Sequence, residues 1–138
     1  MTNKFQIFPV GIVEKQDQSI AITVYKKYKD ALLGLDQFSH IIVFYWFHKN
    51  DSNKQRYVLH VHPKGNQMNP LTGVFATRSP LRPNLIAKST CKIMSIIENV
   101  IYIDKIDALD GSPIIDIKPY IPKIDLILGS RVPDWAKK

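Results

Sequence analysis

Apolar and polar residues alternate along several short stretches of this chain, a pattern typical of β-strands. Residues 19–25 are the clearest case, because Ile20, Ile22 and Val24 alternate with smaller or more polar neighbours. Residues 39–48 are rich in aromatic and β-branched side chains on both faces, which predicts a central strand buried on both sides. Further strands are expected at residues 7–13, 56–62, 74–76, 88–97, 100–103 and 114–120.

The same pattern leaves little room for helix. Residues 26–33 form one short helix candidate, which Gly34 is well placed to end. Glu98 and Asn99 are expected to turn a hairpin between two of the strands. About seven short strands with so little helix indicate an all-β barrel or sandwich. The 138 residues are the size of one domain, 1–138, with residues 122–138 as its C-terminal tail.

Two arginines lie in a proline-stiffened loop within residues 73–89. Pro80 and Pro83 fix their own backbone and favour an extended conformation for the residue before each of them. The loop would present the guanidinium groups of Arg78 and Arg82, which suit carboxylate or phosphate oxygens. From the residues alone, an anion-recognition loop and a rigid connection whose arginines face water both remain open.

The charge composition of the chain indicates which class of partner it binds. Nineteen Lys and Arg against twelve Asp and Glu give a net charge of +7 and a pI near 9.5, which favours a polyanion such as nucleic acid. The longest apolar run is far shorter than a bilayer span, and the N-terminus lacks the features of a signal peptide, so a cytoplasmic protein is expected. A single cysteine, Cys91, excludes an internal disulfide and a multi-cysteine metal site.

Four histidines are the remaining candidate ligands. His40 begins the central strand and is interpreted as structural, whereas His48 lies at the rim where that strand ends, a place where sites often form. His60 and His62 would point the same way on a strand, about 7 Å apart. No third ligand is evident beside them, so we interpret them as a surface or RNA-facing pair and expect no metal site.

Three separate blocks, residues 34–48, 73–86 and 107–120, carry more specific information. The second reads Gly-Val-Phe-Ala-Thr-Arg-Ser-Pro-Leu-Arg-Pro-Asn-Leu-Ile, and the third reads Asp-Ala-Leu-Asp-Gly-Ser-Pro-Ile-Ile-Asp-Ile-Lys-Pro-Tyr. In wording, order and spacing the blocks resemble the TrmO family, also called TsaA-like or YaeB-like. The resemblance implies a single antiparallel β-barrel and a homodimer with its site near the subunit interface. It also implies S-adenosylmethionine-dependent methylation of N6 of threonylcarbamoyladenosine beside the anticodon of tRNA.

The resemblance assigns roles to residues at matching positions. Loop architecture or tRNA contact is implied for Arg82 and Asn84. The candidates for the base that takes the N6 proton are Asp107, Asp110 and His48, and the sequence does not choose among them. Asp110 precedes a glycine, and such pairs are also common as plain turn formers. Cofactor contact is implied for His48, Lys49, Arg78, Ser89, Ile106, Asp107, Ala108, Leu109 and Asp110.

Two departures from the family pattern leave other functions open. Residues 14–18 run straight to the next strand, where the family has a longer loop that helps to hold the cofactor. Leu85 and Ala87 stand where the family usually has Pro and Gly. The alternatives are a barrel of the same fold that binds RNA or a small anionic ligand without catalysis, and a methyltransferase with a different acceptor.

Overall fold

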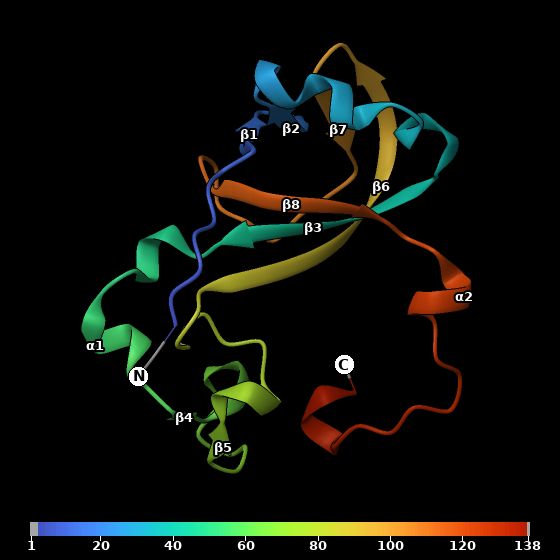
Figure 1. Ribbon diagram of the computed structural model, residues 1–138. Helices are drawn as coiled ribbons and strands as arrows, with labels where there is room; N and C mark the ends of the chain where they lie inside the picture. Colours follow the sequence, from blue (N-terminus) through green and yellow to red (C-terminus); the bar gives the residue numbers. More distant parts are fainter. Residues whose placement is uncertain (1–2, 138) are drawn as a thin grey trace. The chain divides into compact units, whose positions relative to one another are not determined.

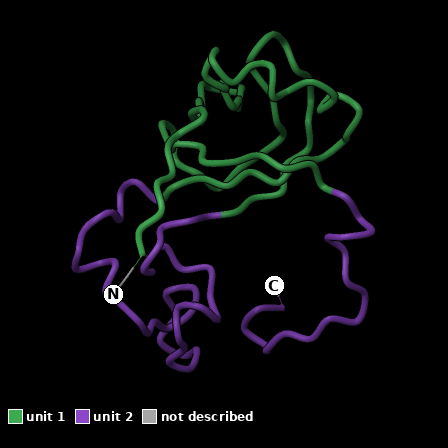
Figure 2. Tube along the Cα trace, viewed as in Figure 1, with its two compact units in different colours: residues 1–46, 88–120 green, residues 47–87, 121–138 purple. Residues whose placement is uncertain are grey.

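The chain forms two compact units in the computed structural model, which describes residues 3–137. The first unit comprises residues 1–46 and 88–120, and the second comprises residues 47–87 and 121–138 (Figure 2). Among residues 3–137, no helix has the length and apolar character needed to cross a membrane.

The first unit is built on a closed barrel of six antiparallel strands, which confirms the predicted all-β barrel (Figure 1). The strands follow one another around the barrel in the order β1-β2-β7-β6-β3-β8. Two short 3₁₀ helices, η1 (Lys26–Leu32) and η2 (Leu35–Gln37), connect β2 to β3. The strands are β1 (Gly11–Gln16), β2 (Ser19–Val24), β3 (His40–Trp46), β6 (Ile86–Ile97), β7 (Val100–Ile103) and β8 (Pro113–Pro119).

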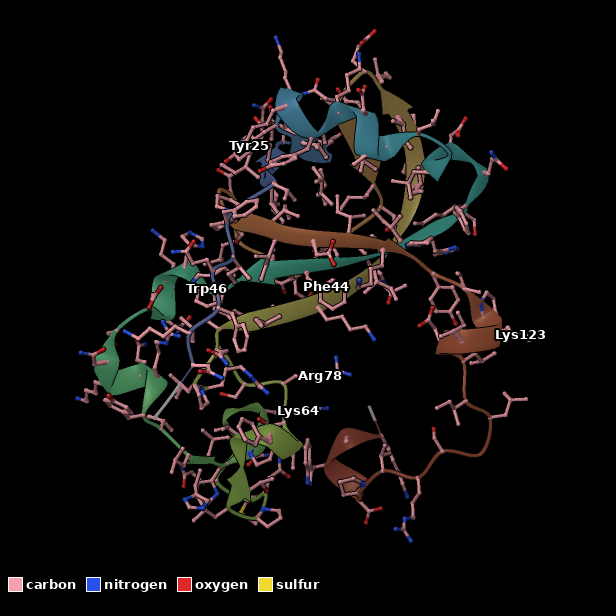
Figure 3. All side chains as sticks on the ribbon, in the orientation of Figure 1. Tyr25, Phe44, Trp46, Lys64, Arg78 and Lys123 are labelled. Carbon is pink, nitrogen blue, oxygen red and sulfur yellow. The ribbon has the colours of Figure 1, made fainter. Side chains whose placement is uncertain are left out.

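The barrel core is aliphatic, and β3 contributes most to it. Ile41, Ile42 and Val43 are all buried, as expected for a central strand covered on both faces. Farther along β3 the even-numbered side chains Phe44 and Trp46 are only half-buried (Figure 3). The side chains that are fully buried in this unit are Val13, Ile22, Ile41, Val43, Cys91, Ile101 and Ile114.

The first strand lies farther along the chain than predicted. Residues 7–10 are not part of a strand, because Pro9 has no N–H to donate and pairing with β2 begins only at Gly11. A Cβ atom on Gly11 would lie 2.5 Å from the carbonyl oxygen of Thr23, so the close approach of the two strands requires glycine there. β1 then continues to Gln16, and a tight turn with Asp17 at φ 44° leads into β2.

The predicted helix and hairpin of this unit are largely found. The helix is a 3₁₀ segment rather than an α-helix, and Gly34, at φ 88°, precedes η2 instead of closing η1. Glu98 adopts φ 55° in the turn between β6 and β7, as the predicted hairpin requires. The two strands joined by this turn begin and end close to their predicted limits.

The second unit consists of short elements. Its only sheet among the described residues is the two-stranded pair β4 (His60–Val61) and β5 (Thr72–Gly73). The C-terminal segment, residues 121–137, forms two short helical segments and is mostly exposed. The helical segments are η3 (His48–Asn50), α1 (Asn53–Arg56), η4 (Pro63–Gly65), η5 (Val74–Ala76), α2 (Pro122–Asp125) and η6 (Asp134–Ala136).

Two predicted strands in this unit are wrong. Residues 56–62 contain a strand only at His60–Val61, because Ser52 caps a helix over the preceding residues by accepting a hydrogen bond from the Gln55 backbone N–H (3.2 Å). Residues 74–76 form a 3₁₀ turn, in which the Val74 carbonyl accepts the backbone N–H and the hydroxyl of Thr77 (3.1 and 2.9 Å). The Thr77 hydroxyl thus offers the backbone a local alternative to strand pairing.

Candidate functional site

The two arginines of the stiff loop have different surroundings. Arg82 points back into its own loop, where Nη1 donates hydrogen bonds to the carbonyl oxygens of Thr77 (3.2 Å) and Ser79 (3.0 Å). Arg78, labelled in Figure 3, is exposed and has no hydrogen-bond or ion-pair partner among residues 3–137. Arg82 therefore holds the loop in shape, while the guanidinium of Arg78 is available to an anionic ligand.

A third arginine, which sequence reasoning missed, supports the same loop. Arg56 donates from Nε to the Pro83 carbonyl (2.8 Å) and from Nη2 to the Asn84 side-chain oxygen (3.4 Å). Its Nη1 also pairs with Asp51 (3.2 Å). Arg56 thus joins α1 to the loop. No local pattern marks this role, because its loop partners are a backbone carbonyl and an amide 27 and 28 positions away.

The predicted residues at the end of the central strand lie in η3. The His48 side chain is half-buried and Lys49 is exposed, and neither has a hydrogen-bond partner among the described residues. His62 is engaged elsewhere in the second unit, since its Nδ1 bonds to the Asn69 carbonyl oxygen (2.8 Å). Within residues 3–137 there is no group of three or more His, Cys, Asp or Glu side chains placed to hold a metal ion.

The barrel unit brings a polar group together around Tyr45. Burial raises the pKa of Tyr45, a hydrogen bond with Ser89 lowers it, and the nearby charge of Asp107 raises it again. Cys91 lies in the same neighbourhood and is fully buried. Burial, with the charges of Asp104 and Asp107, raises its pKa to about 12, so the thiol stays neutral near pH 7. The predicted site residues Ser89 and Asp107 thus share an environment with Tyr45.

Lys15, whose role the sequence analysis also did not predict, fixes the turn that carries Asp107. Its Nζ donates to the Ile106 carbonyl oxygen (2.8 Å), and its backbone N–H donates to the Asp110 carboxylate (2.8 Å). The turn is closed at its other end by the hydroxyl of Ser112, which donates to the carbonyl oxygen of Leu109 (2.6 Å). The end of β1 therefore organises residues 106–110 through Lys15.

These contacts give the two aspartates of the turn, Asp107 and Asp110, different roles. Asp110 shapes the turn, because its carboxylate accepts the Lys15 backbone N–H and Gly111 follows it at φ 83°. Asp107 is exposed and accepts no hydrogen bond within residues 3–137. Ile106 and Ala108, on either side of Asp107, are buried and anchor the turn. Of the turn's carboxylates, Asp107 is the one free to contact a ligand.

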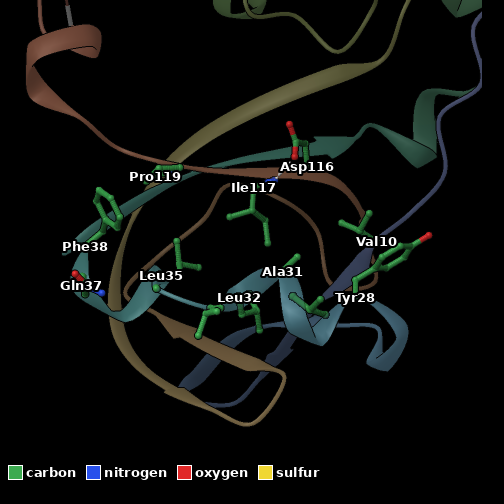
Figure 4. Close-up of a pocket in the computed structure, with 13 residues that line it drawn as sticks. Val10, Tyr28, Ala31, Leu32, Leu35, Gln37, Phe38, Asp116, Ile117 and Pro119 are labelled. Atoms are coloured by element: carbon green, nitrogen blue, oxygen red, sulfur yellow. Dashed lines mark hydrogen bonds between the residues drawn. The ribbon is translucent and has the colours of Figure 1, made fainter.

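A cavity of about 460 Å³ lies elsewhere in the barrel unit, between η1, η2 and β8 (Figure 4). Its walls are mainly apolar, with Leu32, Leu35, Phe38 and Ile117 among the lining side chains, and Asp116 also lines it. None of the residues predicted for cofactor or RNA contact lines this cavity.

Comparison with known proteins places the chain in a sequence family. The profile of the tRNA-methyltransferase O N-terminal domain matches residues 3–126. A relative from Methanocaldococcus jannaschii, named "Probable S-adenosyl-L-methionine-binding protein", is 49% identical over 121 residues, which cover 88% of this chain and 96% of the relative. A mouse protein named "tRNA (adenine(37)-N6)-methyltransferase" is 38% identical over 103 residues, covering 74% of this chain and 23% of the mouse protein.

Solved structures show the same fold. A crystal structure of TrmO from Pseudomonas aeruginosa superimposes with a TM-score of 0.77 at 24% identity and covers 98% of this chain. The chain spans 63% of the length of that protein.

Proposed function

The chain belongs to the tRNA-methyltransferase O N-terminal domain family, and on that premise we propose that it is an S-adenosylmethionine-dependent tRNA methyltransferase. The proposed acceptor is the N6 nitrogen of threonylcarbamoyladenosine beside the anticodon. The observation that carries the proposal is the family match over residues 3–126, nearly the whole chain. It is supported by a 49%-identical relative named for binding S-adenosylmethionine and by a mouse relative named for methylating N6 of adenine 37 in tRNA.

The side chains fit the charges of the cofactor. S-adenosylmethionine presents a carboxylate, which suits the exposed and unpaired guanidinium of Arg78. Leu109, in the turn of residues 106–110, is 57% exposed and offers apolar surface to the adenine. The bound cofactor would supply an electrophilic methyl group on a sulfonium.

The role of the chain is to position the acceptor and to receive its proton. Alignment of the N6 nitrogen with the methyl group can account for roughly 7–11 kcal/mol of the barrier. As N6 bonds to the methyl carbon, its proton must leave, and we assign the acceptor of that proton to the Asp107 carboxylate. Asp110 is a weaker candidate, because its carboxylate is engaged in shaping the turn. His48 and Lys49 are assigned to cofactor contact, and the active unit to a cytoplasmic homodimer.

A methyl-transfer assay tests the proposed reaction. The protein is incubated with methyl-labelled S-adenosylmethionine and either threonylcarbamoylated tRNA or the same tRNA without that modification. Label should enter only the modified tRNA, and nucleoside analysis should place it on N6. Label in the unmodified tRNA alone would show a different acceptor and overturn the acceptor assignment. No transfer to either tRNA would overturn the enzymatic assignment.

The shortened β1–β2 connection favours one second candidate, a barrel that binds RNA or a small anionic ligand without catalysis. β1 pairs with β2 from Gly11–Val24 to Gln16–Ser19, which leaves only two residues in the turn. That turn has no room for the longer cofactor-holding loop of the family. A protein that binds tRNA but neither S-adenosylmethionine nor S-adenosylhomocysteine would favour this candidate.

A further inference from the structure

The net charge of the chain is confined to one unit. The second unit, residues 47–87 and 121–138, contains ten Lys and Arg against three Asp and Glu, which leaves +7. The barrel unit contains nine of each, which leaves zero. The whole excess of positive charge, and with it the attraction to a polyanion, therefore resides in the second unit.

Exposed aromatic rings accompany this charge. Phe75 is 82% exposed and Tyr57 is 79% exposed, although rings of this size are usually buried. Both belong to the second unit. An exposed ring within a basic surface is the combination by which proteins bind unpaired nucleotides, since the ring stacks on a base while cations meet the phosphates.

The backbone brings the segments carrying the two rings together. β4 and β5 pair through His60–Gly73 and Val61–Thr72, and the Val74 N–H extends the ladder by donating to the Leu59 carbonyl (2.9 Å). Tyr57 lies two residues before Leu59, and Phe75 directly follows Val74. Both rings therefore come from the same end of this two-stranded ladder. Val74 is buried and anchors the 3₁₀ turn η5, whereas the side chain of Phe75 in the same turn is exposed and takes no part in the core.

We propose that the second unit is the RNA-binding unit of this protein and that Phe75 and Tyr57 stack on unpaired bases of the RNA. The inference rests on the proposed function only in taking RNA as the partner. It adds two stacking contacts between aromatic rings and bases, and it limits the contacts between cationic side chains and phosphates to the second unit. The resemblance implied loop architecture or tRNA contact for Arg82 and Asn84, and the structure shows both engaged in holding the loop.

The stacking part is tested by fluorescence anisotropy with two RNAs of equal phosphate number, a hairpin with an unpaired loop and a blunt duplex. Phe75→Ala should weaken binding of the hairpin by about 5- to 150-fold, the effect of losing one base–ring stack, and should change duplex binding little. Phe75→Trp should restore hairpin binding. Leu33→Ala is the matched control, because Leu33 is 95% exposed in the barrel unit. Equal affinities of wild type and Phe75→Ala for the hairpin would overturn the stacking assignment.

The charge part is tested by the salt dependence of hairpin binding between about 50 and 200 mM. The double variant Lys54→Gln/Lys123→Gln removes two exposed cations of the second unit and should lower the slope of log affinity against log salt by about one for each phosphate that is no longer neutralised. The matched pair Lys26→Gln/Lys92→Gln in the barrel unit should leave the slope unchanged. The reverse pattern, or an equal decrease in slope from both pairs, would overturn the confinement of the electrostatic RNA contacts to the second unit.

Experiments on the wild-type protein distinguish a failure of this inference from a failure of the proposed methyltransferase function. RNA binding by wild type with methyl transfer intact, but without these variant effects, would overturn the inference and leave the proposed function standing. Absence of any hairpin or tRNA binding by wild type would overturn both.

Discussion

Replacement of each loop arginine by alanine separates ligand binding from loop support. Arg78 is exposed and unpaired, so Arg78→Ala should change the free energy of unfolding by no more than about 0.5 kcal/mol. If its guanidinium grips the cofactor carboxylate, the charge-assisted hydrogen bonds removed by the substitution are worth about 1.5–3 kcal/mol. Their removal corresponds to about a 10- to 150-fold increase in the Kd for S-adenosylhomocysteine.

Arg82→Ala is the matched control within the same loop. It removes the hydrogen bonds to the carbonyls of Thr77 and Ser79, at 3.2 and 3.0 Å, and should lower the free energy of unfolding by about 1–3 kcal/mol. For a chain of this size each kcal/mol lowers Tm by about 3–5 °C. Ligand binding should fall only as far as the loop loses its shape.

Thermal unfolding and calorimetric titration of both variants provide the test. Arg78→Lys adds a second comparison. It keeps the positive charge but cannot form bidentate hydrogen bonds with a carboxylate, so it should recover only part of the affinity. If Arg78→Ala loses as much stability as Arg82→Ala, Arg78 is a structural residue. If Arg78→Ala binds S-adenosylhomocysteine as tightly as wild type, Arg78 does not contact the cofactor.

Three further predictions concern the barrel unit. Lys15→Met should lower the free energy of unfolding by about 1–2 kcal/mol and weaken S-adenosylhomocysteine binding, because the Ile106 carbonyl loses its partner; unchanged urea unfolding would contradict this. The raised pKa of Cys91 means that stability falls as pH rises above about 9, where the unfolded thiol ionises and the folded one does not; Cys91→Ala should flatten that decline in urea midpoints. Hydrogen bonds from the backbone N–H groups of Lys92 and Lys105 hold the pKa of Asp104 below its ordinary value. Its stabilising contribution should therefore be present above about pH 4 and fade below it, and Asp104→Asn should flatten the acid side of the same profile.

Strands with a clear alternation of apolar and polar residues, or with a β-branched run, could be predicted from the sequence. Segments without such a pattern could not. β2 and β7 were predicted within one residue, because alternation or a β-branched run ends at a clear turn. The strand predicted at residues 56–62 was wrong although a contrary signal was present. Ser52 followed by Gln55 is the spacing of a helix N-terminal cap, and both side chains take part in it.

The candidate site, too, could be predicted only in part from the sequence. The resemblance pointed to the arginine loop and to the turn at residues 106–110, and the structure gives both defined shapes. Lys15 and Arg56 could not be found this way, because Lys15 reaches a backbone carbonyl 91 residues away and Arg56 one 27 residues away. Backbone acceptors have no residue-type signature, so only the fold reveals such supports. The cofactor contacts, the single-domain organisation and the homodimer remain predictions.

Calorimetric titration of the purified protein with S-adenosylmethionine and S-adenosylhomocysteine shows whether the chain binds the cofactor that the proposed methyl transfer requires. We expect a saturable interaction with a Kd in the micromolar range for both ligands, weakened about 10- to 150-fold in Arg78→Ala and unchanged in the Leu33→Ala control. Absence of binding to either ligand, with or without tRNA present, would contradict the claim that this barrel is a methyltransferase.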